Sequence, residues 1–288
     1  MSLYRRPSEL QEALAELAGG DRVVAAGCTD LFPATEQPAL PGAVLDITAI
    51  AGLRGITRGP EGWRIGATTT WTDIARADLP AGFDMLRQAA REVGSIQIQN
   101  AGTIAGNLCN ASPAADGVPP LLALGAEVEL ASATGARRMP LADFLTGPRR
   151  TALAPGELLV AVHVPATAGQ GASRFLKLGA RKYLVISIAM VAVRIVAEAG
   201  RATDLALSIG ACGPVATRLP LVEAALTGLP LAELAGAIRA GDVAAAIAPI
   251  DDIRGDAAYR RTAAAELLRR AVAGVAADLA GQRPEDLA

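Results

Sequence analysis

The sequence predicts an α+β protein in which two small α/β units precede a C-terminal domain with a three-stranded antiparallel sheet and helices. Apolar runs of strand length alternate with helical patterns as far as residue 164, which indicates the α/β units. Three longer apolar runs follow one another between residues 174 and 211, as in an antiparallel meander. From residue 220 onward, Ala and Leu recur at helical spacing, so helices are expected to complete the chain.

The first unit, residues 1–55, is expected to contain one helix and two strands. Ser8 and Gln11 have the spacing of a capping box that would open the helix, and Gly19 would end it. The two strands are predicted at Arg22–Ala26 and Ala43–Ile47, which are short and mostly apolar.

The second unit, residues 56–170, is expected to hold strands and helices around an irregular segment. Its strands are predicted at Trp63–Ala67, Glu127–Ala131 and Leu158–Val164, and its helices at Thr72–Arg76 and Asp84–Val93. Gly94–Pro120 is rich in Gly, Asn, Ser and Pro and has no regular period. We therefore expect a long ordered loop there, of the kind that usually carries function.

The C-terminal domain, residues 171–288, is expected to follow a linker at Pro165–Ser173, which contains three Ala and two Gly. Its three strands are predicted at Arg174–Leu178, Ser187–Ala197 and Asp204–Ala211. Its last long helix is predicted from Ala257 to about Leu279.

Composition excludes several classes of function. The chain has 27 Lys and Arg against 29 Asp and Glu, with no long basic run, so a nucleic-acid partner is not expected. The longest apolar run, Tyr183–Val193, is far shorter than the roughly 20 residues of a membrane span. No signal-like segment follows the N-terminus, and three scattered cysteines suit a reducing compartment, so we expect a cytoplasmic protein. Three cysteines cannot supply the four thiolates of an ordinary iron–sulfur cluster.

Two segments carry the residues expected to bind a ligand. The first, Ala25–Leu31, follows a predicted strand, and its small residues let the backbone approach a ligand closely. By itself this pattern is more typical of an ordinary turn. The second, Gln99–Asp116 (QNAGTIAGNLCNASPAAD), offers hydroxyl and amide donors and ends in a carboxylate. Such a set suits a phosphate-and-sugar ligand, although it would also suit a surface loop that satisfies its own backbone.

Together the two segments resemble the FAD-binding medium subunit of the molybdenum hydroxylases, the xanthine dehydrogenase and carbon monoxide dehydrogenase family. Members of that family carry A-G-G-T-D-L in the first segment and N-x-G-T-I-G-G-N-L-x-x-A-S-P-x-x-D in the second. The resemblance extends to Tyr4–Pro7, Ile65–Thr69, Asp252–Gly255 and Tyr259–Arg261, and so covers nearly the whole chain.

The resemblance implies a two-lobed FAD-binding fold of the vanillyl-alcohol-oxidase (PCMH) type, with non-covalent FAD between the lobes. The residues implied to wrap the diphosphate and ribityl chain are Val24, Ala25, Ala26, Gly27, Cys28, Thr29, Asp30 and Leu31. Those implied to form the opposing wall are Thr103, Gly106, Asn107, Asn110 and Asp116. Val160 or Leu159 would pack on the flavin, and Lys177 matches a family lysine near the isoalloxazine, where a cation can stabilise reduced flavin. The alternative for Lys177 is a solvated lysine on an edge strand.

The sequence departs from the family pattern at several positions. Cys28 replaces a glycine in the first segment, and Ala105 replaces the first glycine of a pair in the second. Both changes reduce tolerance for positive φ. Gln99 stands where Arg is common, and Arg181–Ala189 lacks the Asp that some relatives have before Ile-Ala. His163 has no acid or Cys near it in sequence and is expected to be structural.

The resemblance implies an electron-transfer subunit with no catalytic residue and no metal ligand of its own. Electrons would arrive from a small [2Fe-2S] subunit and leave to an external acceptor, while a large molybdopterin-binding subunit would hydroxylate the substrate. The assembly would be a dimer of heterotrimers. Two alternatives remain open, a stand-alone FAD-dependent oxidase of the same fold and an assembly subunit with a degenerate FAD site.

Overall fold

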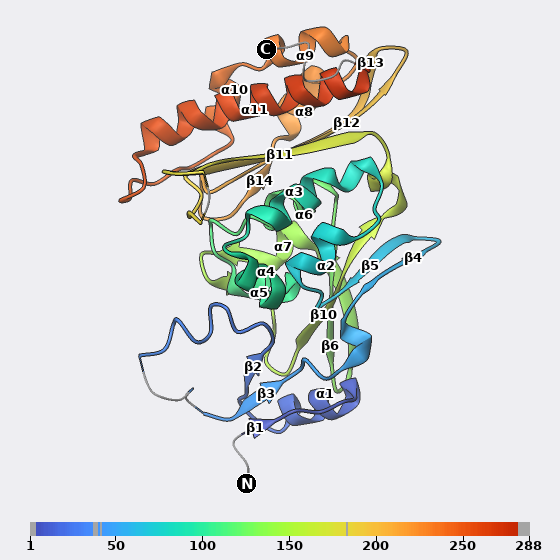
Figure 1. The fold of residues 1–288 in the computed structure, drawn as a ribbon, viewed down its shortest axis with the longest axis vertical. Coiled ribbons are helices and arrows are strands. Elements are labelled where there is room, and N and C mark those ends of the chain that lie inside the picture. Colours follow the sequence, from blue (N-terminus) through green and yellow to red (C-terminus); the bar gives the residue numbers. More distant parts are fainter. Residues whose placement is uncertain (1–3, 37–39, 41, 183, 282–288) are drawn as a thin grey trace.

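The computed structural model describes residues 4–36, 40, 42–182 and 184–281. Three layers follow one another along its longest axis (Figure 1). A small three-stranded sheet with helix α1 lies at one end, a five-stranded sheet with short helices lies in the middle, and a four-stranded sheet covered by helices lies at the other end. Tyr183, the first residue of the longest apolar run, lies outside the described residues.

The first layer is a parallel sheet of three short strands, β1 (Tyr4–Arg5), β2 (Val23–Ala25) and β3 (Val44–Asp46), in the order β1-β3-β2. Helix α1 (Leu10–Ala18) buries Ala13 and Leu14 against it, in a cluster with Leu45. The predicted capping box is wrong, because the helix begins two residues after Ser8. Its N-cap is Glu9, whose side chain makes no capping hydrogen bond. The 3-10 turn η1 (Ala51–Leu53) leads to the next layer.

The middle layer is an antiparallel sheet in the order β4-β5-β10-β6-β7. Its strands are β4 (Ile56–Gly59), β5 (Gly62–Gly66), β6 (Glu127–Ser132), β7 (Gly135–Pro140) and β10 (Leu158–Pro165). A two-stranded ribbon, β8 (Leu145–Gly147) and β9 (Arg150–Thr151), lies beside it. The three predicted strands are present. The edge strands β4 and β7 were not expected from the sequence, because they are mostly exposed and rich in polar residues.

Short helices cover this sheet, and they also occupy the segment for which a loop was expected. They are α2 (Trp71–Arg76), η2 (Ala81–Phe83), α3 (Asp84–Glu92), α4 (Ile96–Ala101), α5 (Ile104–Asn110), α6 (Val118–Ala123) and α7 (Leu141–Phe144). The loop expectation for residues 94–120 is therefore wrong. Helices α4 and α5 have six and seven residues, too few to show a period, and each begins at a hydroxyl cap, Ser95 and Thr103.

The third layer is an antiparallel sheet of β11 (Ala172–Leu178), β12 (Ala189–Glu198), β13 (Arg201–Gly210) and β14 (Thr217–Arg218). The meander is as predicted, with β14 as a short fourth strand, and β12 begins two residues later than expected. The helices on its outer side are α8 (Pro220–Leu226), η4 (Leu231–Glu233), α9 (Leu234–Ala237), α10 (Ala240–Ala245) and α11 (Ala257–Leu279). Both predicted ends of the last helix are confirmed.

Both faces of the third sheet are buried, which explains the continuous apolar run of β12. Val191, Val193 and Ile195 pack with the outer helices, whereas Met190 and Ala192 pack with the middle layer. Helices α3 and α6 of the middle layer contact this inner face. Of the nine residues of the expected linker, four form the 3-10 turn η3 (Ala166–Gly169), and the last two already belong to β11. We keep 1–55, 56–170 and 171–288 as a proposed division into domains. No helix within the described ranges is both long and apolar enough to cross a membrane.

Candidate functional site

The structure brings the two predicted binding segments into direct contact. A Cβ added at Gly27, in the first segment, would lie 2.0 Å from the carbonyl oxygen of Ala101 in the second. Only glycine permits so close an approach of the two backbones. The backbone of residues 67–69 anchors the second segment. The amide of Ala105 donates to the carbonyl of Ala67 at 3.1 Å, and the amide of Ile104 donates to the carbonyl of Thr69 at 3.0 Å.

Cys28 occupies a left-handed backbone conformation, with φ of +56°. The family has glycine at this position, and a residue with a Cβ pays about 1–2 kcal/mol for this conformation. The thiol donates to the carbonyl of Ala26 at 3.5 Å. Burial raises the pKa of Cys28 above its ordinary value, and the Asp46 carboxylate adds to the shift. Cys28 is therefore a protonated thiol held by a strained backbone, not an activated one.

Ala105 lies inside α5, in ordinary helical conformation, so its replacement of a family glycine introduces no strain. Gln99 donates through Nε2 to the carbonyl of Arg91 at 2.9 Å. Of the departures from the family pattern at these three positions, Cys28 alone alters the backbone energetics of the two binding segments.

Polar side chains connect the two segments further along their length. The amide of Asn110 donates to the carboxylate of Asp30, and its carbonyl oxygen accepts from the guanidinium of Arg149. Arg149 enters this network from the ribbon β8–β9 with φ of +57°. The sequence analysis missed Arg149, since nothing in its neighbourhood resembles a binding motif.

Asn107, on the same helix as Asn110, has an unpaired polar atom. Its Oδ1 is buried and has no hydrogen-bond partner among the described residues. A Cβ added at Gly117 would lie 3.0 Å from this oxygen. A buried acceptor without a donor is costly in a folded protein, so this oxygen indicates a place where a ligand donor is expected.

A buried ion pair joins the end of the second segment to the C-terminal sheet. Lys177 Nζ lies 2.7 Å from Asp116 Oδ2, and the two side chains are 7% and 9% exposed. Lys177 also donates to the carbonyl of Glu92 at 3.3 Å, and the Ser187 hydroxyl donates to Asp116 Oδ1 at 2.6 Å. Burial raises the pKa of Asp116 above its ordinary value, while the charge of Lys177 and both hydrogen bonds oppose the shift. The alternative of a solvated Lys177 is wrong, although β11 is an edge strand.

Ser187 takes the place of the Asp that some relatives carry. A second carboxylate would repel Asp116 here, whereas the hydroxyl donates to it. The sequence showed the substitution but gave no sign of its partner, which is 71 residues away.

The remaining residues singled out from the sequence differ in their burial and in their contacts. Thr103 uses its hydroxyl to accept from the amide of Gly106 at 3.1 Å, as the cap of α5. Val160 is 1% exposed and packs in the apolar cluster under the first layer, so its side chain does not reach the surface. His163 is not without an acid, because Glu129 on the neighbouring strand lies 2.6 Å from its Nε2.

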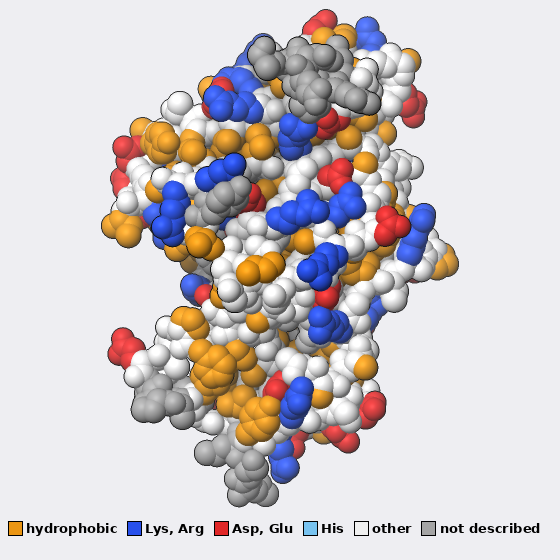
Figure 2. All heavy atoms as spheres, viewed as in Figure 1, with side chains coloured by type: hydrophobic (Ala, Val, Ile, Leu, Met, Phe, Trp, Pro, Cys, Tyr) orange, Lys and Arg blue, Asp and Glu red, His pale blue; other side chains and the backbone are white. Residues whose placement is uncertain are grey.

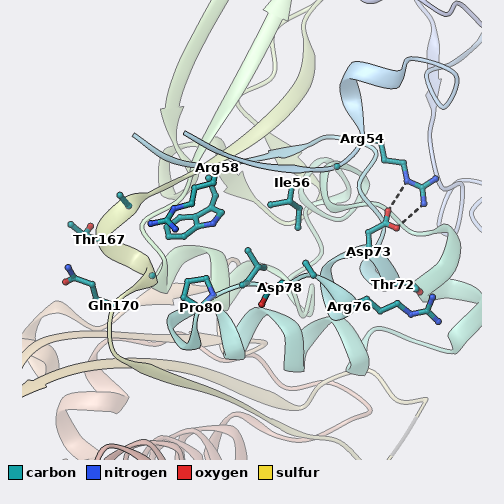
Figure 3. A pocket seen from close by; sticks show the side chains of 16 residues that line it. Arg54, Ile56, Arg58, Thr72, Asp73, Arg76, Asp78, Pro80, Thr167 and Gln170 are labelled. Carbon is teal, nitrogen blue, oxygen red and sulfur yellow. Dashed lines mark hydrogen bonds and ion pairs between the residues drawn. The ribbon is translucent and has the colours of Figure 1, made fainter. Parts of the chain in front are cut away.

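Two hollows in the surface are lined by residues outside the two segments. The larger, of about 1160 Å³, lies between the β4–β5 hairpin and α2, and contains none of the predicted FAD residues (Figure 3). Figure 3 shows Arg58 on one wall and the Arg54–Asp73 ion pair, 2.9 Å long, at the other end. A smaller hollow of about 540 Å³ is lined by Lys177 together with residues of α3 and the segment after β11.

These observations fit FAD. The backbone of Gly27 contacts the second segment at Ala101, and α5 in that segment carries polar side chains and the unpaired oxygen of Asn107, groups that could hold a diphosphate and a polyol. Within the described ranges, no three His, Cys, Asp or Glu side chains are grouped so that they could hold a metal ion.

Comparison with known proteins agrees with this architecture. Residues 1–167 match the family described as FAD binding domain in molybdopterin dehydrogenase, and residues 174–275 match the CO dehydrogenase flavoprotein C-terminal domain. The chain belongs to this family of FAD-binding medium subunits of molybdenum hydroxylases, and is thus an oxidoreductase subunit.

Individual relatives cover almost the whole chain. The glyceraldehyde dehydrogenase medium chain of Sulfolobus acidocaldarius is 33% identical over 95% of this chain and 98% of its own. The carbon monoxide dehydrogenase medium chain of Afipia carboxidovorans is 33% identical over 93% and 94%. A chain of reconstituted CO dehydrogenase from Oligotropha carboxidovorans superposes with a TM-score of 0.87 at 30% identity, over 95% of this chain and 97% of that one.

Proposed function

We propose that this protein is the FAD-binding electron-transfer subunit of a multi-subunit molybdenum hydroxylase. It receives electrons from a small [2Fe-2S] subunit and passes them to an external acceptor, while a large molybdopterin-binding subunit oxidises the substrate. The observation that carries the proposal is the close contact of the two glycine-containing segments, the second of which also contains the unpaired oxygen of Asn107. Bound FAD would supply a carrier that accepts electrons singly or in pairs.

Each side chain has a defined task in this proposal. Residues 24–31 and the residues Thr103, Gly106, Asn107 and Asn110 hold the diphosphate and ribityl chain from opposite sides. Asp116 acts less as an open acceptor for the polyol than as the partner that fixes the position of Lys177. Lys177, which lines the smaller hollow, provides a cation on the isoalloxazine side. Val160 is kept as a packing residue in the cluster beneath the first layer, against which Ala26 of the first segment packs.

Exposed apolar side chains support the proposal that this chain binds partner subunits. Phe32 and Tyr4, both in the first unit, are 59% and 51% exposed. Figure 2 shows apolar side chains gathered over this end of the molecule. Exposed aromatic and aliphatic groups of this kind are typical of interfaces. We propose a dimer of heterotrimers, and a cytoplasmic location because Cys28, Cys109 and Cys212 are all free thiols.

The test is the visible spectrum of the chain purified with and without its partner subunits. The proposal expects bound flavin in the complex, released by denaturation. Absence of flavin from the complete complex would contradict it and favour an assembly subunit with a degenerate site. Bound flavin that oxidises a substrate without iron–sulfur or molybdenum partners would favour a stand-alone oxidase.

A variant pair tests the site itself. Asn107→Leu is expected to lower FAD occupancy severely, because it replaces the unpaired acceptor with an apolar group. Gln11→Leu is the control, since Gln11 is exposed on α1, outside both binding segments. Equal occupancy in the two variants would show that the site assignment is wrong.

A further inference from the structure

Arg260, in the last helix, is a buried cation to which the proposed function gives no role. It belongs to the Tyr259–Arg261 segment and is 2% exposed. Its Nη1 donates to the carbonyls of Ile188 and Ala211, at 2.6 and 2.8 Å, and its Nη2 donates to Asp252 Oδ1 at 2.6 Å. One guanidinium therefore holds two strand ends, because its planar donors have fixed directions.

Both of these strand ends also contact the second FAD segment. Ile188 follows Ser187, whose hydroxyl donates to Asp116 Oδ1 at 2.6 Å. Ala211 donates through its own amide to the carbonyl of Pro113 at 3.0 Å. Ala211 has φ of +60°, a left-handed conformation that a residue with a Cβ keeps only when its surroundings impose it.

We propose that Arg260 is a positioning residue for the FAD site. From the C-terminal domain it fixes residues 187–188 and 211, and through them it sets the position of Pro113 and Asp116 in the second binding segment. The Lys177–Asp116 pair then keeps its orientation toward the flavin. This inference rests on the proposed function, and it assigns to the C-terminal domain a part in cofactor binding.

The experiment compares Arg260→Met with Arg269→Met in the full-length chain freed of flavin. Arg269 lies on the same helix and donates to the carbonyl of Ile238 at 2.9 Å, so its loss also removes a backbone anchor from the C-terminal domain. We expect Arg260→Met to raise the FAD dissociation constant at least about tenfold, measured by flavin fluorescence quenching. Arg269→Met is expected to leave it within about twofold. Arg260→Lys should restore part of the affinity.

A second measurement separates positioning from loss of stability. Ser187→Ala removes one of the two connections between Arg260 and the second binding segment. Adding Arg260→Lys to the Ser187→Ala variant should therefore weaken FAD binding by a smaller factor than adding Arg260→Lys to the wild-type chain. The comparison of Arg260→Lys with and without Ser187→Ala still tests the positioning role if Arg260→Met does not fold. Independent effects of the two changes, or equal losses of affinity in Arg260→Met and Arg269→Met, would overturn the inference.

Hydrogen exchange of the flavin-free chain keeps the inference distinct from the proposed function. Exchange at the amides of residues 114–118 should rise in Arg260→Lys and stay unchanged in Arg269→Met. If the wild-type chain bound no FAD, the proposed function would fail, and exchange would still decide whether Arg260 orders this segment. Unchanged exchange in Arg260→Lys would overturn the inference.

Discussion

Removal of Lys177 should destabilise the protein in a pH-dependent way. Lys177→Met leaves the Asp116 carboxylate buried with one remaining donor, the Ser187 hydroxyl. Breaking a buried ion pair by removing one partner costs about 3–5 kcal/mol. Because the Ser187 hydroxyl still donates to Asp116, we expect the free energy of unfolding to fall by about 3 kcal/mol at pH 7, the lower end of this range.

The pH dependence follows from the carboxyl that is left behind. Without the lysine, burial raises the pKa of Asp116 further, so the folded state binds a proton that the unfolded state has already released. Stability then falls as the pH rises from the unfolded pKa of about 3.9 to the raised folded pKa, by up to about 1.4 kcal/mol per pH unit. The deficit relative to the wild type should therefore be small near pH 4 and largest at neutral pH.

Urea unfolding of the flavin-free chain between pH 4 and pH 8 measures this deficit. The double variant Lys177→Met with Asp116→Asn should recover most of the loss, since no buried charge remains. Arg270→Met is the control, because its ion pair with Glu266 is exposed and contributes about 0.3–0.5 kcal/mol. A deficit below about 1 kcal/mol at pH 7, or one that does not change with pH, would refute this reasoning.

Three further predictions concern the same region and its support. Gly27→Ala should weaken FAD binding at least about tenfold by forcing the two segments apart, and Gly52→Ala, where a Cβ meets nothing, should not; flavin titration compares them. Cys28→Gly should relieve backbone strain and stabilise the fold by about 0.5 kcal/mol, visible as a higher Tm; a lower Tm would contradict it. Burial alone would raise the pKa of Asp73, but the Arg54 ion pair and the capping hydrogen bonds lower it below its ordinary value. Asp73→Asn should therefore cost about 1 kcal/mol at pH 7, and this cost should shrink as the pH falls from the unfolded pKa of about 3.9 through the lowered folded pKa; a pH-independent cost in urea unfolding would exclude this cause.

Local patterns predicted much of the fold. The last helix runs from Ala257 to Leu279 as expected, because many turns of regular spacing and an Asp256 cap specify it. The buried strands of the two larger sheets were predicted for the same reason. Edge strands such as β7 and short helices such as α5 were not predicted, because an exposed strand lacks apolar alternation and seven residues span only two turns.

The candidate site was likewise predicted only in part. Motif spacing placed Gly27 and Asn107 in segments that could bind FAD, and the structure brings those segments into contact. What the sequence could not predict is which side chains would pair with one another. Arg149 entered the site from a ribbon whose sequence carries no binding pattern.

The sequence by itself determined the type of each segment, the family and the two binding segments, since these depend on the order of residues over short stretches. Tertiary structure alone decided that Cys28 is strained, that Asp116 faces Lys177, and that Arg260 holds the strand ends beside it. Asp116 and Lys177 are 61 residues apart, and Ile188 and Arg260 are 72 apart. Such pairs form only when sheets and helices pack, because burial removes the water that would otherwise satisfy each charge alone.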